Sequence, residues 1–340
     1  MNKMKLIITG LIFFILSAAV HPLQSQLNNN SYGKNSESIS LRLLDKHSVL
    51  FEKRKIEEKV PFAIDTLKFK KAKNKTLPSG QKTKIHPVRL SLLLGGMFTG
   101  WLGMHIYYSQ TWWKNRAHYF KFDEDPYYAR NVDKLSHVYT ANLISASGSI
   151  LYRWTGLNPT LSIVLGATTS IAYETYIEIN DGFSPDWGFD WGDMAGNFIG
   201  ALYPVAQHFV KPLQTVNIKW SFKPAWLEKK LRNYPDLLDD YTSMKFWLAF
   251  NPYDLLSKKI QRYYPSFLGI GLGVTLQNAS HVTGTANAFS DFYLAFDIDI
   301  TKLPGNTDFL IALKKILNFY HIPTPGVKFT HGAVWYGLLF

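Results

Sequence analysis

The sequence predicts a mainly α-helical fold, in which a membrane-associated bundle of four helices is followed by a small antiparallel β region. Four long apolar segments lie between residues 87 and 212, separated by turns rich in glycine and proline. After residue 212 the pattern changes, because apolar and polar residues begin to alternate one by one. About four such runs occur, which is too few to close a barrel alone.

Residues 1–25 predict a signal peptide. The basic start is followed by an apolar run at residues 6–20, which is as long as a signal-peptide core and short for a membrane-spanning helix. Cleavage after the small Ser25 is expected to start the mature chain at Gln26. An uncleaved membrane anchor is the alternative. The sequence therefore predicts export to the periplasm or cell envelope.

Residues 26–86 predict a basic, mostly disordered arm that is rich in asparagine, serine and lysine. Residues 26–90 hold 15 Lys and Arg against 6 Asp and Glu, so 15 − 6 = +9 of the net charge of +12 lies here. In an exported protein this charge favours a membrane lipid or another anionic envelope polymer as partner, and no nucleic acid is expected. The sequence does not indicate the oligomeric state.

The helical domain is predicted at residues 87–212, with helices at residues 88–113, 131–152, 159–179 and 191–210. Pro159 fits the first turn of the third helix, where a missing backbone N–H is harmless. All four segments are apolar enough for a membrane, yet three carry polar pairs. A bundle in or on the membrane and a soluble bundle therefore both remain open.

The C-terminal β-rich region, residues 213–340, predicts strands at residues 244–250, 267–276, 292–301 and 327–340. Phe292, Leu294 and Phe296 alternate with more polar residues, which is typical of a strand with one face in water. The chain ends at Phe340 after apolar residues at alternate positions, like the last strand of outer-membrane proteins. An ordinary strand that closes a small sheet is the alternative, so the outer membrane remains one option.

Three of the expected helices each carry two polar residues spaced four apart, which places both on one helix face. The pairs are Asp133 and His137, Glu174 and Glu178, and Asp193 and Asn197, with Asp190 one turn before the last pair. Apolar helices bury polar groups only where these find partners. Glycines at every fourth position of the last helix, ending at Gly200, permit a close approach. The sequence therefore predicts that the three pairs converge.

Such a cluster fits a metal site, a catalytic centre, a structural network or a site that recognises another ligand. It can hold a divalent metal through Asp133, Glu174, Glu178 and Asp193. It can form a catalytic centre from His137, Glu174 and Asp193. It can also be a structural polar network that fixes the helix register, built with Lys134, Asp181, Asp190, Asn197 and Gly200, in which Lys134 and Arg153 supply the counter-charges.

Few other cofactors or reactions are compatible with the sequence. The chain has no cysteine, which excludes disulfides, thiolate metal sites and a cysteine nucleophile. It contains no phosphate-binding loop, no serine-hydrolase elbow and no paired-histidine zinc motif. The sequence therefore supports none of the standard enzyme classes and leaves the cofactor unknown, with a divalent metal as one option.

Several motifs within residues 89–210 carry a resemblance to a known family. They are Gln110-Thr111-Trp112-Trp113, Asp133-Lys134-x-x-His137, Glu174-x-x-x-Glu178-x-x-Asp181-Gly182-Phe183-Ser184 and Asp193-x-x-x-Asn197-x-x-Gly200. In combination they resemble the YfiM-like periplasmic proteins and lipoproteins of unknown function. Ser136 departs from this pattern, which usually has glycine before the histidine, and the lipoprotein cysteine is absent.

The order Asp-Lys-x-x-His, Glu, Asp-x-x-x-Asn-x-x-Gly is also similar to that of VanZ-like membrane proteins. This resemblance implies a role in the cell envelope and no particular reaction. Three functional hypotheses follow. The first is a membrane-associated envelope protein with a structural or ligand-binding polar network. The second is a membrane-embedded or metal-dependent hydrolase acting on a lipid or cell-wall precursor, and the third is an outer-membrane assembly component.

Overall fold

The structure is a computed structural model that describes residues 84–122, 128–223, 240–278, 288–330 and 332–340. The chain divides into two units, Met1–Lys82 and Thr83–Phe340, and the described residues all belong to the second. The predicted signal peptide, the cleavage after Ser25 and almost all of the predicted basic arm lie outside the described residues.

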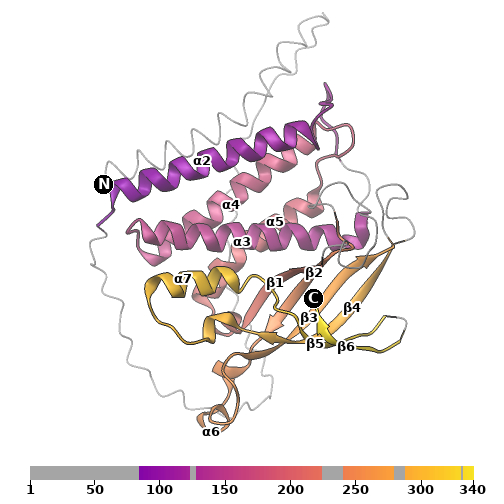
Figure 1. Ribbon diagram of the computed structural model, residues 1–340. Coiled ribbons are helices and arrows are strands. Elements are labelled where there is room, and N and C mark those ends of the chain that lie inside the picture. Colours follow the sequence, from indigo (N-terminus) through magenta and orange to yellow (C-terminus); the bar gives the residue numbers. More distant parts are fainter. Residues whose placement is uncertain (1–83, 123–127, 224–239, 279–287, 331) are drawn as a thin grey trace, which may run out of the picture. The chain divides into compact units, whose positions relative to one another are not determined.

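The helical part contains four long helices, close to the positions that the sequence predicts (Figure 1). They are α2 (Pro87–Gln110), α3 (Val132–Trp154), α4 (Pro159–Asp181) and α5 (Trp191–Phe209). A mainly α-helical protein with a β region is therefore confirmed. The four-helix membrane bundle is not, because α3, α4 and α5 pack extensively on one another whereas α2 buries only Leu93 and Tyr108.

Helix α2 is the one described helix that is long and apolar enough to cross a membrane. Only 6% of its most apolar window is buried, and side chains such as Leu92, Phe98 and Ile106 are exposed. Its contacts with α3 and α4 are few, and one of them is the edge-to-face contact of Trp101 with Tyr176 (4.9 Å between centroids). Leu93 packs with Tyr152, and Tyr108 packs with Ile177.

Small residues bring the backbones of α3, α4 and α5 together. A Cβ atom at Gly200 of α5 would lie 2.1 Å from the carbonyl oxygen of Val138, and one at Gly166 of α4 would lie 2.3 Å from that of Ser145. Both distances are far below van der Waals contact, so only glycine fits at these crossings. The hydroxyl of Ser145 donates to the Ala201 carbonyl (2.8 Å), which ties α3 to α5 at the same level.

The β region is one six-stranded antiparallel sheet in which each strand pairs with the next along the chain. The strands are β1 (Val216–Phe222), β2 (Met244–Phe250), β3 (Leu268–Gln277), β4 (Phe289–Ile298), β5 (Thr324–Lys328) and β6 (Val334–Leu339). The expectation of about four strands was wrong. It missed β1, and it read β5, β6 and the turn between them as one run.

Short helices connect these elements. They are η1 (Tyr128–Asn131), η2 (Lys211–Thr215), η4 (Tyr253–Leu255), α6 (Lys258–Gln261), η5 (Ile300–Lys302) and α7 (Asp308–Leu317). The sequence reading missed α7, although Thr307 caps it by accepting from the Leu310 amide (3.3 Å) and Asp308 occupies its first turn.

The sheet curls toward closure. Tyr320, which precedes β5, forms a parallel bridge with Trp220 on the free edge of β1. The Trp220 amide donates to the Phe319 carbonyl (2.9 Å), and the His321 amide donates to the Trp220 carbonyl (2.9 Å). Since the segment before β5 reaches β1 while β5 itself pairs with β4, one face of the sheet is enclosed.

The enclosed face of the sheet carries the polar residues of β4, together with the apolar Trp247 and Tyr293, contrary to the expectation that the polar residues of this strand would face water. Asp297 of β4 is 1% exposed, and Lys219 of β1 is fully buried beside it with its Nζ 2.8 Å from Asp297 Oδ2. The apolar Phe292 and Phe296 of the same strand β4 are about half exposed, at 57% and 47%. The alternation was correctly identified, but the curling of the sheet reverses which face meets the surroundings.

One apolar cluster joins the helices to the sheet. Val132 of α3 and Phe246 of β2 belong to it, together with the partly buried Tyr139 and Trp220. The Tyr139 ring stacks on Trp220 with 6.1 Å between centroids. Through this contact the first turns of α3, which carry the polar cluster described below, pack on strands β1 and β2.

Candidate functional site

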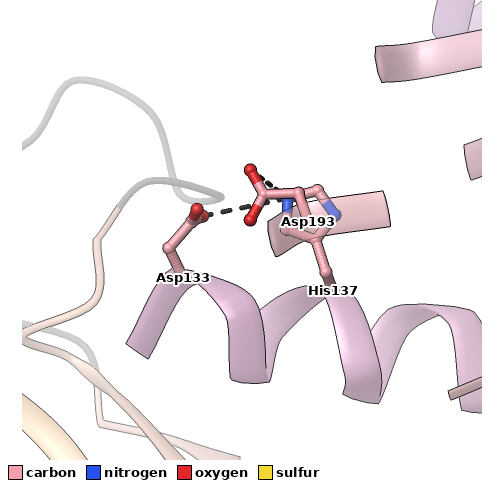
Figure 2. A group of neighbouring side chains, drawn as sticks. All are labelled: Asp133, His137 and Asp193. Atoms are coloured by element: carbon pink, nitrogen blue, oxygen red, sulfur yellow. Dashed lines mark ion pairs between the residues drawn. The ribbon is translucent and has the colours of Figure 1, made fainter. Parts of the chain in front are cut away.

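Five of the six residues of the predicted polar pairs meet between α3, α4 and α5. Asp133 and His137 come from the first two turns of α3, Glu178 from the end of α4, and Asp193 and Asn197 from the first half of α5. Figure 2 shows Asp133, His137 and Asp193 pointing toward one another across the α3–α5 contact.

Local structure places the α5 residues. Asp190 caps α5 by accepting from the Gly192 amide (2.5 Å), and its own backbone amide donates to Glu178 Oε2 (3.3 Å). These two bonds tie the beginning of α5 to the end of α4. Asp193 then lies in the first turn of α5, where a carboxylate is favoured by the helix dipole.

His137 is the centre of the cluster. Its Nδ1 atom lies 3.0 Å from Asn197 Oδ1, and since an amide oxygen only accepts, Nδ1 carries the proton and donates. The other ring nitrogen, Nε2, faces Asp193 Oδ2 at 3.7 Å and Asp133 Oδ1 at 3.9 Å. Both distances exceed a hydrogen bond, so Nε2 points into a gap between two carboxylates.

Lys134 neutralises the outer side of the same carboxylates. Its Nζ atom lies 2.5 Å from Asp190 Oδ2, 3.0 Å from Asp193 Oδ1 and 3.6 Å from Asp133 Oδ2. Asp133 and Asp193 thus each turn one oxygen toward Lys134 and the other toward His137. Lys134 is thus paired with three carboxylates. Arg153 is exposed near the end of α3 and forms no ion pair within the described residues, so its assignment as a counter-charge was wrong.

Burial and the neighbouring charges shift the pKa of His137, Glu178 and Asp193. Burial alone would lower the pKa of His137, but the carboxylates of Asp133, Asp193 and Glu178 raise it to about 10. Burial raises the pKa of Glu178 to about 9 against the attraction of His137. Burial and the nearby Asp133 raise the pKa of Asp193 to about 7. The cluster therefore holds more carboxylates than cations and has an affinity for positive charge.

Glu174 lies deeper along α4 than Glu178 and is 2% exposed. Its Oε1 atom is buried without a hydrogen-bond partner among the described residues, and burial raises the pKa of Glu174 to about 7. The charge of His137 acts in the opposite direction and lowers the pKa of Glu174. Glu174 does not belong to the group of three residues whose ligand atoms converge.

Asp181 is also separate from the centre. Its Oδ1 accepts from the Trp113 indole (2.6 Å), so this carboxylate ties the end of α4 to the segment after α2. Gly200 has the role expected for it, since α5 crosses Val138 of α3 at van der Waals distance only because the glycine has no side chain.

One contributor escaped the sequence reading. The Tyr241 hydroxyl, from the segment just before β2, donates to Asp133 Oδ1 at 2.5 Å, and both residues are buried. Helical periodicity gives no signal for a contact between residues 108 positions apart. The β region therefore helps to orient a site residue of the helical domain.

A metal ion is the ligand that this geometry fits. Asp133, His137 and Asp193 each offer one ligand atom, and these atoms lie within 4.8 Å of one another. Two atoms that are each about 2.1 Å from one ion lie about 3.0 to 4.2 Å apart, which includes both distances measured from His137 Nε2. The Asn197 amide fixes the imidazole from behind, as partners of metal-binding histidines do.

Comparison with known proteins identifies one related family. Residues 122–207 match the model of a family described as "Predicted periplasmic lipoprotein (DUF2279)", whose function is unknown. The match contains every residue of the cluster except Tyr241. The family description supports the prediction that the protein is exported to the periplasm. No curated protein and no solved structure matches the chain.

Proposed function

We propose that this chain is a periplasmic, membrane-associated envelope protein whose helical domain binds one divalent metal ion between Asp133, His137 and Asp193. One observation carries the proposal: His137 Nε2 faces two carboxylate oxygens at 3.7 and 3.9 Å, beyond hydrogen-bond range and at the spacing of ligands around a common ion.

The surroundings support metal binding over a purely structural network. A network that only fixes the helix register is expected to close its hydrogen bonds, because an unsatisfied buried polar group costs about 1 to 3 kcal/mol. Here the buried Glu174 Oε1 and Asn197 Nδ2 atoms have no partner among the described residues, and Nε2 of His137 forms no hydrogen bond there. A bound cation stabilises this excess of carboxylate charge.

The donor set indicates the class of ion. One imidazole nitrogen and carboxylate oxygens, with no thiolate, suit zinc, manganese or ferrous iron. Lys134 is already paired with Asp190 at 2.5 Å, so it can remain in place when an ion binds on the His137 side. Since the His137 imidazolium must lose a proton to bind metal, the affinity is expected to rise with pH.

Membrane association is proposed to rest on α2. This helix has the length and hydropathy of a membrane span, and it leaves most of its apolar surface uncovered by the rest of the described chain. A lipid environment removes that surface from water without further protein contacts.

Metal titration of the purified, metal-stripped protein tests the proposal. Isothermal titration with Zn²⁺ and Mn²⁺ is expected to give one site in the wild type and a loss of affinity in His137→Gln and Asp193→Asn. His208→Gln is the matched control, since His208 is exposed on the same helix as Asp193 and is expected to leave binding unchanged. Asn197→Ala is expected to weaken binding by about 10- to 100-fold, because it removes the partner of Nδ1.

Folding of each variant is checked by circular dichroism, so that lost binding is separated from lost structure. The proposal is wrong if the folded wild type binds neither ion, or if His137→Gln binds as well as His208→Gln.

A second candidate function is a metal-dependent hydrolase acting on a lipid or cell-wall precursor. It is favoured by Glu174, whose carboxyl group is buried close to His137. Burial raises the pKa of Glu174 to about 7, and a general base works best when its pKa lies near the working pH. On this proposal His137 and Asp193 hold the ion and Glu174 moves the proton. Glu174→Gln is then expected to keep metal binding and abolish turnover, whereas a structural Glu174 would leave turnover intact.

A further inference from the structure

The outer face of the β-sheet carries a continuous apolar row. Residues paired directly across neighbouring strands share a face of a sheet. The register places one apolar residue from every strand in a single row: Ile218, Leu248, Leu272, Leu294, Val327 and Trp335. Leu272 is 58% exposed and Trp335 65%, and Ile270 and Phe296 form a second exposed pair beside the row.

The opposite face of the sheet is sealed, and it buries charged side chains beside an apolar cluster that contains Trp247 and Tyr293. Lys219, Asp297 and His321 form a buried cluster there, with His321 Nδ1 3.0 Å from Asp297 Oδ1. Thr275 and Asp291 on the same face are also buried. Strands in water bury their apolar face and expose their polar one, whereas strands in lipid do the reverse. The exposed apolar outer face of this sheet, with charged side chains buried behind it, is the arrangement expected in lipid.

The apolar face is covered at one end only. Phe246 and Leu276 lie on it and are buried in the cluster that joins the sheet to α3. On this face the pair after Phe246 and Val274 is Leu248 and Leu272, and both leucines are exposed. The uncovered part continues from there to the C-terminal ends of β2 and β4. The helical domain thus accounts for part of the face, and no described segment covers the remainder.

Two elements at the uncovered end have the character of a membrane interface. The β2–β3 connection exposes the apolar Ile260 and Tyr263 together with Lys258, Lys259 and Arg262. None of these three cations forms an ion pair with another described residue. Unpaired cations beside exposed apolar side chains are complementary to the anionic headgroups of phospholipids.

Helix α7, which follows β4 through η5 and also contacts α3, is amphipathic and buries none of its residues. Phe309, Ile316 and Leu317 are exposed, and Lys315 is exposed beside them. An exposed apolar helix face with lysines at its border is typical of helices that lie in the headgroup region of a bilayer.

We propose that the uncovered outer face of the sheet is immersed in the hydrocarbon of a phospholipid bilayer, with the basic β2–β3 connection and α7 at the headgroups. Among the described strands only β3 and β4, with 10 residues each, have the length of a membrane-crossing strand. The sheet therefore enters the bilayer without crossing it. This inference does not rest on the proposed metal site.

The absence of cysteine in the chain makes a local test possible. Leu272→Cys and Leu294→Cys are labelled with an environment-sensitive fluorophore in the full chain, reconstituted with vesicles of phosphatidylethanolamine and phosphatidylglycerol. Asp186→Cys, in the exposed turn between α4 and α5, is the control. Both leucine positions are already exposed, so the labels are expected to leave the fold intact.

The labels at Leu272 and Leu294 are expected to be quenched by lipids with brominated acyl chains and shielded from aqueous iodide, and the label at Asp186 to show the reverse. Because these signals are local, anchoring by α2 alone cannot produce them. Replacing Lys258, Lys259 and Arg262 by glutamine is expected to lower the equilibrium constant for insertion of this face about fivefold for each charge removed, and quenching by brominated lipid is expected to fall with it.

Two results would overturn the proposal. Free access of iodide to Leu272 and Leu294 would show that this face stays in water. Shielding from iodide without quenching by brominated lipid would show that protein, such as a second copy of this chain, covers the face instead. Metal titration of the same labelled samples reports separately on the site in the helical domain.

Discussion

Replacing Glu174 by glutamine removes one titrating group from the interior of the helical domain and keeps the shape of the side chain. In the metal-free protein, burial raises the pKa of Glu174 from 4.5 to about 7. Below pH 4.5 the carboxyl group is protonated in the folded and unfolded states alike, so it has no effect on the pH dependence of stability.

As the pH rises from 4.5 to 7, the unfolded chain loses this proton while the folded protein retains it. The free energy of unfolding therefore falls, and the loss is complete once the pH exceeds the folded pKa. The difference of 7 − 4.5 = 2.5 pKa units corresponds to about 3 kcal/mol. Glu174→Gln lacks this loss, so relative to the wild type it is expected to gain about 3 kcal/mol between about pH 4.5 and pH 8.

Urea denaturation followed by tryptophan fluorescence, with a chelator present, measures this difference at the two pH values. Asp186→Asn is the control, because Asp186 is exposed in the turn between α4 and α5 and its replacement is expected to change stability by less than about 0.5 kcal/mol. A Glu174→Gln variant whose stability relative to the wild type is the same at both pH values would refute the assignment of a desolvated carboxyl group.

Three further substitutions test the packing around the site, each by chemical denaturation of the metal-free protein. Gly200→Ala is expected to destabilise the fold by about 1 to 3 kcal/mol, because its Cβ would lie 2.1 Å from the Val138 carbonyl oxygen; unchanged stability would mean that α5 does not cross α3 this closely. Tyr241→Phe is expected to cost about 1 to 3 kcal/mol by removing a donor to the buried Asp133, and an intact midpoint would place Tyr241 elsewhere. Asn158→Ala is expected to cost about 1 kcal/mol, since its side chain caps α4 at the Leu161 amide (2.8 Å), and no loss would indicate a frayed first turn.

Much of the helical domain was predictable because its signals are local. The turn at Asn158 and Pro159 marks the beginning of α4 in both the sequence and the structure, since a capping side chain and a first-turn proline act within a few residues. The same holds for Asp190, which caps α5. The convergence of Asp133, His137 and Asp193 was also inferable, because four-residue spacing fixes a shared helix face.

What the sequence could not provide depends on contacts between distant segments. Tyr241 reaches Asp133 only because the sheet packs against the start of α3. The enclosure of Asp297 depends on the segment around Tyr320 returning to β1, and period-two alternation contains no information about which face is enclosed. Arg153 was assigned as a counter-charge from its charge alone, although its place at the end of α3 keeps it exposed.

Anomalous X-ray diffraction from crystals soaked in Zn²⁺ tests the central claim most directly, because it locates the ion relative to the side chains. The metal-binding proposal predicts one strong peak between α3 and α5, within about 2.3 Å of His137 Nε2 and of one carboxylate oxygen each from Asp133 and Asp193. An ordered cluster without such a peak, with His137 Nε2 bonded directly to a carboxylate or a water molecule, would contradict it and leave a structural polar network as the better account.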